Sequence, residues 1–220
     1  MITSTALPRS DVSAGCLAEY ESFAALVESL DEDAWSAPSR CTGFEVRDVA
    51  GHVIGLAEDT AAGKPGSRNA EEEAASVRHE SPQGAAARLR AACESIAALL
   101  GAVDDAAWDA PIGVADLTLG QGVLTLWYDT FVHADDIRAA LGRAAERGDG
   151  LRASVLYLTE QLTDRNWGPA TLALDGLDPY DVGAGGQPVT GDPLEFVLVA
   201  TGRRDAAVFG LDPSVNIYAE

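Results

Sequence analysis

The chain has 220 residues, of which 47% are hydrophobic and 23% are charged. This length supports one substantial core, or a core of about 150 residues with a smaller appendage. The formal net charge is -20, and the 15 basic residues do not gather into a stripe, so binding to nucleic acid or anionic lipid is disfavoured. Charged residues interrupt every apolar stretch, so no membrane span is predicted.

The N-terminal residues, the cysteines and the lysine content give expectations about cellular location, thiol state and source. The first ten residues contain one arginine and no apolar block of signal-peptide length, which predicts a cytoplasmic protein. Three widely spaced cysteines, Cys16, Cys41 and Cys93, suit neither a disulfide framework nor a zinc ribbon, and predict buried or idle thiols. Lys64 is the only lysine beside abundant arginine and alanine, a bias typical of GC-rich coding sequence that indicates an actinobacterial source.

Apolar residues recur at intervals of three and four along four long segments, the period of amphipathic helices. The predicted helices cover residues 11–30, 46–61, 81–102 and 120–141. Clusters of Pro, Gly and Ser separate them, notably at residues 35–43 and 63–69. Connections of this length favour an antiparallel bundle, and no internal repeat is apparent.

The composition changes after a further predicted helix at residues 151–167. Residues 170–174 alternate in polarity, residues 180–186 are rich in glycine, and residues 192–201 return to helical spacing. We therefore predict a mainly α protein with two domains: a helical bundle over residues 1–148 and a small α+β domain over residues 149–220.

A carboxylate and an imidazole lie one turn apart in the last helix of the predicted bundle. Asp129 and His133 are four residues apart, so their side chains project from one face and can share a ligand. Residues 127–133 are apolar enough that burying both groups needs compensation. Two interpretations stay open: the pair hydrogen-bonds internally, or it binds a metal ion.

His52 is the candidate for a third ligand, because it interrupts the apolar run at residues 49–54. Two imidazoles and one carboxylate with vacant positions suit zinc, iron, nickel or manganese. Asp136, one turn beyond His133, is placed to orient an imidazole by accepting a hydrogen bond. His79 lies in a polar neighbourhood, and we predict it to be a solvated surface residue outside the site.

Three longer motifs extend over nearly the whole chain. The first leads to His52 through Trp35, Pro38, the pair Gly43-Phe44 and the triplet Val46-Arg47-Asp48. The second, residues 129–142, is similar to a pattern E-x-x-x-H-x-x-D before a helix-ending glycine, with Asp129 where Glu is usual. The third is a Gly-Arg signature at residues 201–204. Together these motifs resemble the mycothiol-dependent maleylpyruvate isomerase family of the DinB-like superfamily, and only residues 63–80 lack a clear counterpart.

The resemblance implies a DinB-like four-helix bundle with a small C-terminal α+β domain. It also implies a divalent metal, commonly zinc, held by His52, Asp129 and His133, on which mycothiol or a similar thiol becomes the reactive thiolate. An isomerase or S-transferase would then add this thiolate to a small electrophile. Arg203 would hold a substrate carboxylate, unless it is a surface or interdomain arginine, and with Asp136 it completes the predicted catalytic set.

Asp129 marks the point where the chain departs from the family pattern. Because Asp is one methylene shorter than Glu, either the helix lies closer to the metal, or a water bridges the gap, or the pocket persists without metal. Two other functions remain open. One is a DinB-like enzyme of specialised metabolism that performs a cyclisation, elimination or hydrolysis without thiol, and the other is a non-catalytic small-molecule binding module. A monomer or homodimer acting on a small molecule is expected.

Overall fold

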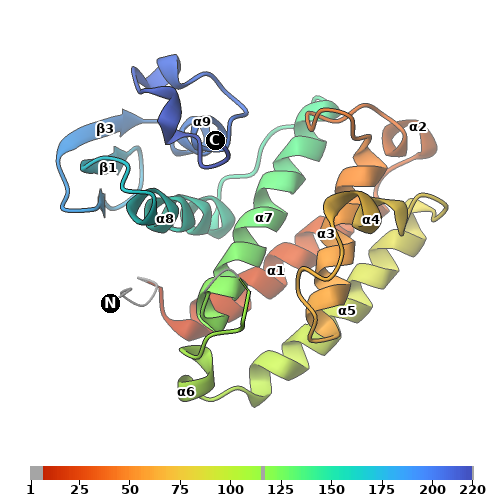
Figure 1. Ribbon diagram of the computed structural model, residues 1–220. Coiled ribbons are helices and arrows are strands. Elements are labelled where there is room, and N and C mark those ends of the chain that lie inside the picture. Colours follow the sequence, from red (N-terminus) through yellow and green to blue (C-terminus); the bar gives the residue numbers. More distant parts are fainter. Residues whose placement is uncertain (1–6, 115–116, 220) are drawn as a thin grey trace. The chain divides into compact units, whose positions relative to one another are not determined.

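The computed structural model of the protein describes residues 7–114 and 117–219 (Figure 1). The chain divides into two compact units, residues 1–146 and 147–220, and each is described by itself. The first six residues, on which the prediction of a cytoplasmic location partly rests, lie outside the described part. Among the described helices, none combines the length and the apolar character that a membrane span requires.

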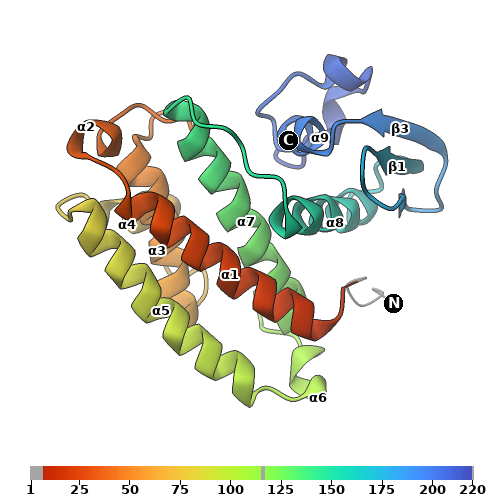
Figure 2. The same cartoon turned by 180° about the vertical axis from the view of Figure 1, so that it is seen from behind.

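The first unit is built on long helices separated by short ones. The long helices are α1 (Arg9–Glu28), α3 (Val46–Ala61), α5 (Pro82–Ala102) and α7 (Leu119–Ala140). Both α1 and α3 pack against α5 and α7 (Figures 1 and 2), which confirms the predicted four-helix bundle. Short helices that were not predicted lie in the connections: α2 (Glu32–Trp35), α4 (Ala70–Ala75) and α6 (Asp105–Trp108).

Side-chain caps fix where α5 and α7 begin. Thr118 and Gln121 form a reciprocal capping box at the start of α7, in which each side chain accepts a backbone N–H of the other residue. Ser81 caps α5, with Pro82 at the first helical position, where its missing N–H costs no hydrogen bond. These caps leave the middle of each helix free to carry apolar or functional side chains.

The bundle core consists of large, fully buried side chains from all the long helices. It includes Tyr20 and Phe23 of α1, Ile54 of α3, Leu89 of α5, and Leu124 and Tyr128 of α7. Small residues allow close helix approach: a Cβ added to Gly15 of α1 would lie 2.0 Å from the Trp127 ring of α7. The apolar period that predicted the helices therefore marks the side of each helix that is packed inside.

Two connections of the bundle repeat one another, which corrects the expectation of no internal repeat. Residues 31–45 form the first corner, which leads from α1 into α3. Residues 104–114 and 117–118 are the described part of the second corner, which leads from α5 into α7. In each, an aspartate caps a one-turn helix that ends on a buried tryptophan, Trp35 or Trp108. A proline three residues later then forms an isolated antiparallel bridge, as Pro38 with Glu45 and as Pro111 with Thr118.

The backbone hydrogen bonds of the two corners correspond one by one. Val46 N donates to Ala37 O at 2.9 Å, as Leu119 N donates to Ala110 O at 3.0 Å. Ser39 N donates to Phe44 O, as Ile112 N donates to Leu117 O. The repeat is short, and its identical residues are confined to residues 31–38 and 104–111, so a search for longer sequence periods does not reveal it.

The second unit pairs helices with a small sheet, which confirms the predicted α+β part of the fold. Its elements are α8 (Asp149–Asp164), β1 (Ala170–Leu174), β2 (Tyr180–Val182), β3 (Gln187–Gly191), α9 (Pro193–Ala200), η1 (Ala206–Phe209) and η2 (Pro213–Val215). The strand order is β2-β1-β3, with β1 antiparallel to β2 and parallel to β3. Residues at alternate positions of β1 are buried, as the alternating sequence predicts.

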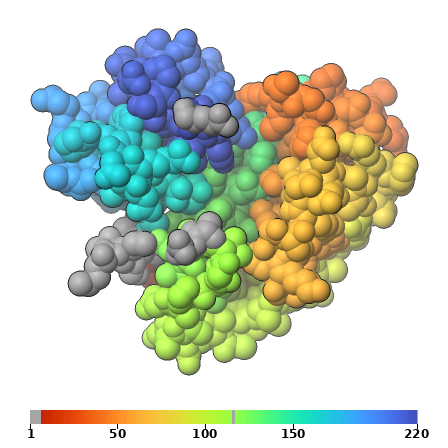
Figure 3. Space-filling view, in the orientation of Figure 1, coloured from red at the N-terminus to blue at the C-terminus, as the bar shows by residue number. Residues whose placement is uncertain are grey.

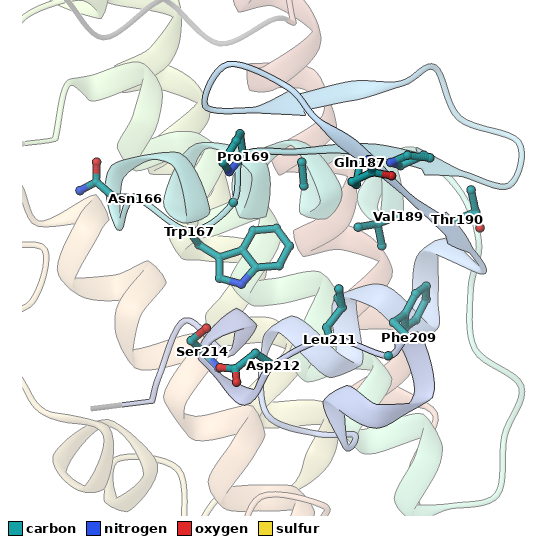
Figure 4. Close-up of a pocket in the computed structure, with 14 residues that line it drawn as sticks. Asn166, Trp167, Pro169, Gln187, Val189, Thr190, Phe209, Leu211, Asp212 and Ser214 are labelled. Carbon is teal, nitrogen blue, oxygen red and sulfur yellow. The ribbon is translucent and has the colours of Figure 1, made fainter.

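An open cavity of about 660 Å³ lies in the second unit (Figure 4). Trp167, Val189 and Leu211 contribute to its apolar walls, and Asp212 and Ser214 lie at one side. Asp212 is the one ionisable residue among those lining the cavity, and its carboxylate already caps η2 by accepting the Ser214 N–H at 3.0 Å. Clustered ionisable chemistry is found instead in the first unit.

Candidate metal centre

Two bundle helices bring the predicted ligands together. His52 lies on α3, while Asp129 and His133 lie one turn apart on α7. One nitrogen of each imidazole and one carboxylate oxygen all lie within 4.8 Å of one another. Asp129 stands between the two rings: Oδ2 is 3.5 Å from His52 Nε2, and Oδ1 is 3.5 Å from His133 Nε2. The shorter side chain of Asp129 thus reaches both imidazoles.

The spacing and the chemistry of these donors fit a divalent ion. Nitrogen and oxygen ligands at tetrahedral zinc, with bonds of about 2.0 to 2.1 Å, lie about 3.3 Å apart, close to the separations found here. Asp129 Oδ2 is buried and lacks a hydrogen-bond partner within the described chain. A buried carboxylate oxygen without a partner is costly, and a bound cation would remove that cost.

Each imidazole has a further carboxylate, besides Asp129, within hydrogen-bond distance of its Nδ1. His52 Nδ1 lies 2.7 Å from Glu73 Oε2, and His133 Nδ1 lies 3.0 Å from Asp136 Oδ2. Both carboxylates are almost fully buried, and an ionised carboxylate can only accept a hydrogen bond. Each Nδ1 therefore carries its proton and donates it, which turns each Nε2 toward Asp129.

The first corner reaches across the bundle to the His133 side of the site. Arg40 donates from Nε to Asp136 Oδ1 at 2.8 Å and from Nη2 to Asp135 Oδ2 at 2.6 Å. Cys41 donates from Sγ to Asp136 Oδ2 at 3.2 Å, and the same sulfur lies 3.9 Å from His133 Nδ1. Cys41 is therefore not an idle thiol. Its sulfur forms a second group of possible ligands with His133 and Asp136.

The charges of the site balance through protons when no ion is bound. Burial lowers the pKa of His52, but the carboxylates of Asp129 and Glu73 outweigh it and raise that pKa to about 9. Burial opposes protonation of His133 too, yet Asp129 and Asp136 raise the pKa of His133 well above its ordinary value. Burial alone would raise the pKa of Asp129, but the two histidines hold it far below its usual range. Two imidazolium charges thus surround one carboxylate where a divalent cation fits.

Arg203 and His79 do not belong to the α3 and α7 residues of this cluster. Arg203 belongs to the second unit, follows α9, is half-buried, and donates from Nη1 to Thr201 O at 3.4 Å. His79 is exposed, as predicted. Three residues at the site had no predicted role: Glu73, Arg40 and Cys41. The last two fall inside the motif that leads to His52, which was the one signal available for them.

The four-helix bundle, with two histidines and a carboxylate between two of its helices, has the DinB-like fold that the sequence motifs predicted. Residues 16–138, more than half of the chain, match the family described as the mycothiol maleylpyruvate isomerase N-terminal domain. The chain belongs to this family, which confirms the resemblance found in the sequence motifs.

Two solved structures are similar over nearly the whole chain. One is a mycothiol-dependent maleylpyruvate isomerase, with a TM-score of 0.67, and the other is a histidine-to-alanine mutant of such an enzyme, with a TM-score of 0.65. Each is 17% identical, and the match covers 97% of this chain and 98% of the other. At that identity the likeness establishes the shared fold. No curated protein sequence matches the chain.

Proposed function

We propose that the protein is a metal-dependent enzyme that activates mycothiol or a similar low-molecular-weight thiol and uses it on a small electrophile. Family membership favours cis–trans isomerisation of a maleylpyruvate-like substrate, with S-transfer as the related outcome. The observation that carries the proposal is Asp129 Oδ2, a buried oxygen without a hydrogen-bond partner in the described chain, beside two imidazoles whose Nε2 atoms face it.

Some side chains would bind the metal ion, and others would orient its ligands or the substrate. His52, Asp129 and His133 would hold the ion through two Nε2 atoms and a carboxylate. A bound divalent ion such as zinc would lower the pKa of a thiol and keep it in the nucleophilic thiolate form. Asp136 acts as a positioning residue, because its carboxylate keeps the proton on His133 Nδ1. Arg203 would bind a substrate carboxylate with its planar fork of donors.

Isomerisation by this route returns the thiol unchanged. The thiolate adds to one carbon of a cis double bond that is conjugated to a carbonyl group. The remaining single bond rotates, and the thiolate then leaves to form the trans isomer. If the adduct instead takes up a proton and stays, the product is a thioether.

The test is turnover of maleylpyruvate by zinc-loaded protein with and without mycothiol, followed by chromatography of the cis and trans isomers. We expect conversion that needs both metal and thiol and is lost in His52→Ala. The exposed His79 provides the matched control, so His79→Ala should keep wild-type activity. Conversion without thiol would point instead to a thiol-independent DinB-like enzyme. A metal-free protein that binds substrate without turnover would point to a binding module.

A further inference from the structure

Glu73 is a buried carboxylate next to the proposed site but outside its predicted ligands. It lies on α4, is 2% exposed, and places Oε2 at 2.7 Å from His52 Nδ1. An ionised carboxylate at this depth is costly unless a donor or a positive charge meets it. His52 is that donor, so the two side chains satisfy one another.

Two glycines of α3 allow α4 to come this close. Gly51 precedes His52, and Gly55 lies one turn further on the same face of the helix as Gly51. A Cβ at Gly55 would lie 2.6 Å from Glu73 Cβ, and a Cβ at Gly51 would lie 2.8 Å from the Ala74 backbone. Any larger residue at either position would push α4, and with it Glu73, away from His52.

An arginine on either side of α4 donates hydrogen bonds to residues of α3. Before α4, Arg68 donates from Nε to Asp59 Oδ1 at 2.9 Å and from Nη2 to Gly55 O at 2.8 Å. After α4, Arg78 donates from Nε to Asp48 Oδ1 at 3.0 Å. Figure 3 shows this part of the chain, orange to gold, as a continuous piece of the surface. The chain on both sides of α4, which carries Glu73, is therefore bound to α3.

The start of α4 is fixed as well. Asn69 and Glu72 form a reciprocal capping box, with Glu72 N donating to Asn69 Oδ1 at 3.0 Å and Asn69 N donating to Glu72 Oε2 at 2.9 Å. The box sets the rotation of a helix of six residues, so Glu73 faces inward while Glu71 stays exposed. The position of the Glu73 carboxylate follows from capping, glycine packing and ion pairs together.

We propose that Glu73 is the positioning residue of His52: its carboxylate fixes the proton on Nδ1 and aims Nε2 at Asp129. Its contribution to metal binding rests on the proposed function, while its control of the imidazole does not. A carboxylate behind a ligand histidine fixes the tautomer and the ring orientation and makes the imidazole a stronger donor. Glu73 meets the nitrogen on the far side from Asp129, so it acts through His52.

The first measurement is zinc affinity in competition with a chelator, for wild type, Glu73→Ala and Glu73→Gln. Glu73→Ala should weaken zinc binding roughly 10- to 100-fold, and Glu73→Gln should weaken it less because the amide oxygen still accepts from Nδ1. Glu71→Ala, on the exposed side of the same turn, should match wild type. If Glu73→Ala does not fold, Glu73→Gln decides, and wild-type zinc affinity in that variant overturns the proposal.

The second measurement is the ¹H–¹⁵N NMR signal of His52 Nδ1–H in the metal-free protein. Wild type should show a downfield, slowly exchanging proton, which Glu73→Ala should lose and Glu71→Ala should keep. A signal unchanged in Glu73→Ala overturns the proposal. If wild type binds no zinc but the signal depends on Glu73, the positioning role stands and the proposed metal-dependent function is overturned.

Discussion

The two histidines of the site are supported in different ways. His133 is held by Asp136, which lies three residues further along the same helix, and the first corner reinforces that carboxylate through Arg40. His52 is held by Glu73, which comes from another helix and reaches the imidazole only because α4 is packed on α3. The contact between Asp136 and His133 is set as soon as α7 forms. The contact between Glu73 and His52 requires the chain between α3 and α5 to pack on α3.

Removing the group that both histidines share should have the largest effect. Asp129→Asn takes away the negative charge between the two Nε2 atoms, so we expect loss of stoichiometric zinc and a fall in the pKa of both imidazoles. Elemental analysis after gel filtration checks the metal. Asp175→Asn, an exposed residue of the second unit, is the control. Full zinc content in Asp129→Asn would contradict the assignment of this ligand.

Removing Asp136 and Glu73 in separate variants tests the difference between the His133 and His52 sides of the site. Asp136→Ala frees His133 Nδ1 and leaves Arg40 paired with Asp135 alone, so we expect a loss of stability no larger than the ~3 to 5 kcal/mol typical of breaking a buried ion pair. Glu73→Ala should cost less, because Arg68 and Arg78 still fasten the segment around α4. Urea unfolding of the metal-free variants measures both changes. A larger loss in Glu73→Ala would reverse the comparison.

The His52 side should also give the metal-free protein a pH-dependent stability. The pKa of His52 is raised to about 9 in the folded state, so its charge stabilises the fold fully below the unfolded value of about 6.5. That contribution is lost as pH rises through about 9. We expect the free energy of unfolding to fall from about pH 7 to about pH 10, and to fall less in Glu73→Gln. Stability that stays flat or rises over this range would contradict the expectation.

Glu19 sets the lower limit of that pH range. Burial raises the pKa of this α1 carboxyl to about 7, so its destabilising ionisation is largely complete above that pH. Burial also raises the pKa of the Cys16 and Cys93 thiols, which adds to the loss of stability as pH approaches about 9, so urea unfolding reports chiefly on the histidines between about pH 7 and about pH 8. Glu19→Gln in the same series should leave the slope unchanged.

The smallest effect is expected at Cys41. A serine hydroxyl can still donate to Asp136 Oδ2, so Cys41→Ser should change zinc affinity by no more than about threefold. Cys93→Ser, on α5, serves as the matched control. A change of about tenfold or more would show that the sulfur is itself a ligand, since thiolate binds zinc far better than a hydroxyl does.

The sequence predicts contacts within one helix better than contacts between helices. The four bundle helices follow from apolar periodicity, and the approach of Asp129, His133 and Asp136 follows from helical spacing alone. His52 needed the family motif, because periodicity does not place two helices relative to one another. The metal itself and the roles of Arg203 and Asp136 remain predictions.

Glu73 could not be predicted, for a physical reason. Three glutamates stand side by side at residues 71–73, and nothing in that run distinguishes the one that faces inward. The choice is made by the contact of α4 with Gly51 and Gly55, which depends on the folded connection. Arg40 and Cys41 lie in the motif that leads to His52, but their contacts could not be predicted, since their partners lie on α7, far along the sequence.

The paired corners carry a lesson for redesign. At the positions where the first corner has Arg40 and Cys41, the second has Gly113 and Val114, although the backbone hydrogen bonds around them correspond. The turn is thus a neutral scaffold, and reactivity is an optional addition to it. The polar side chains of the first corner could therefore be changed while its backbone hydrogen bonds still set the start of α3, so bundle architecture and site chemistry are open to separate modification.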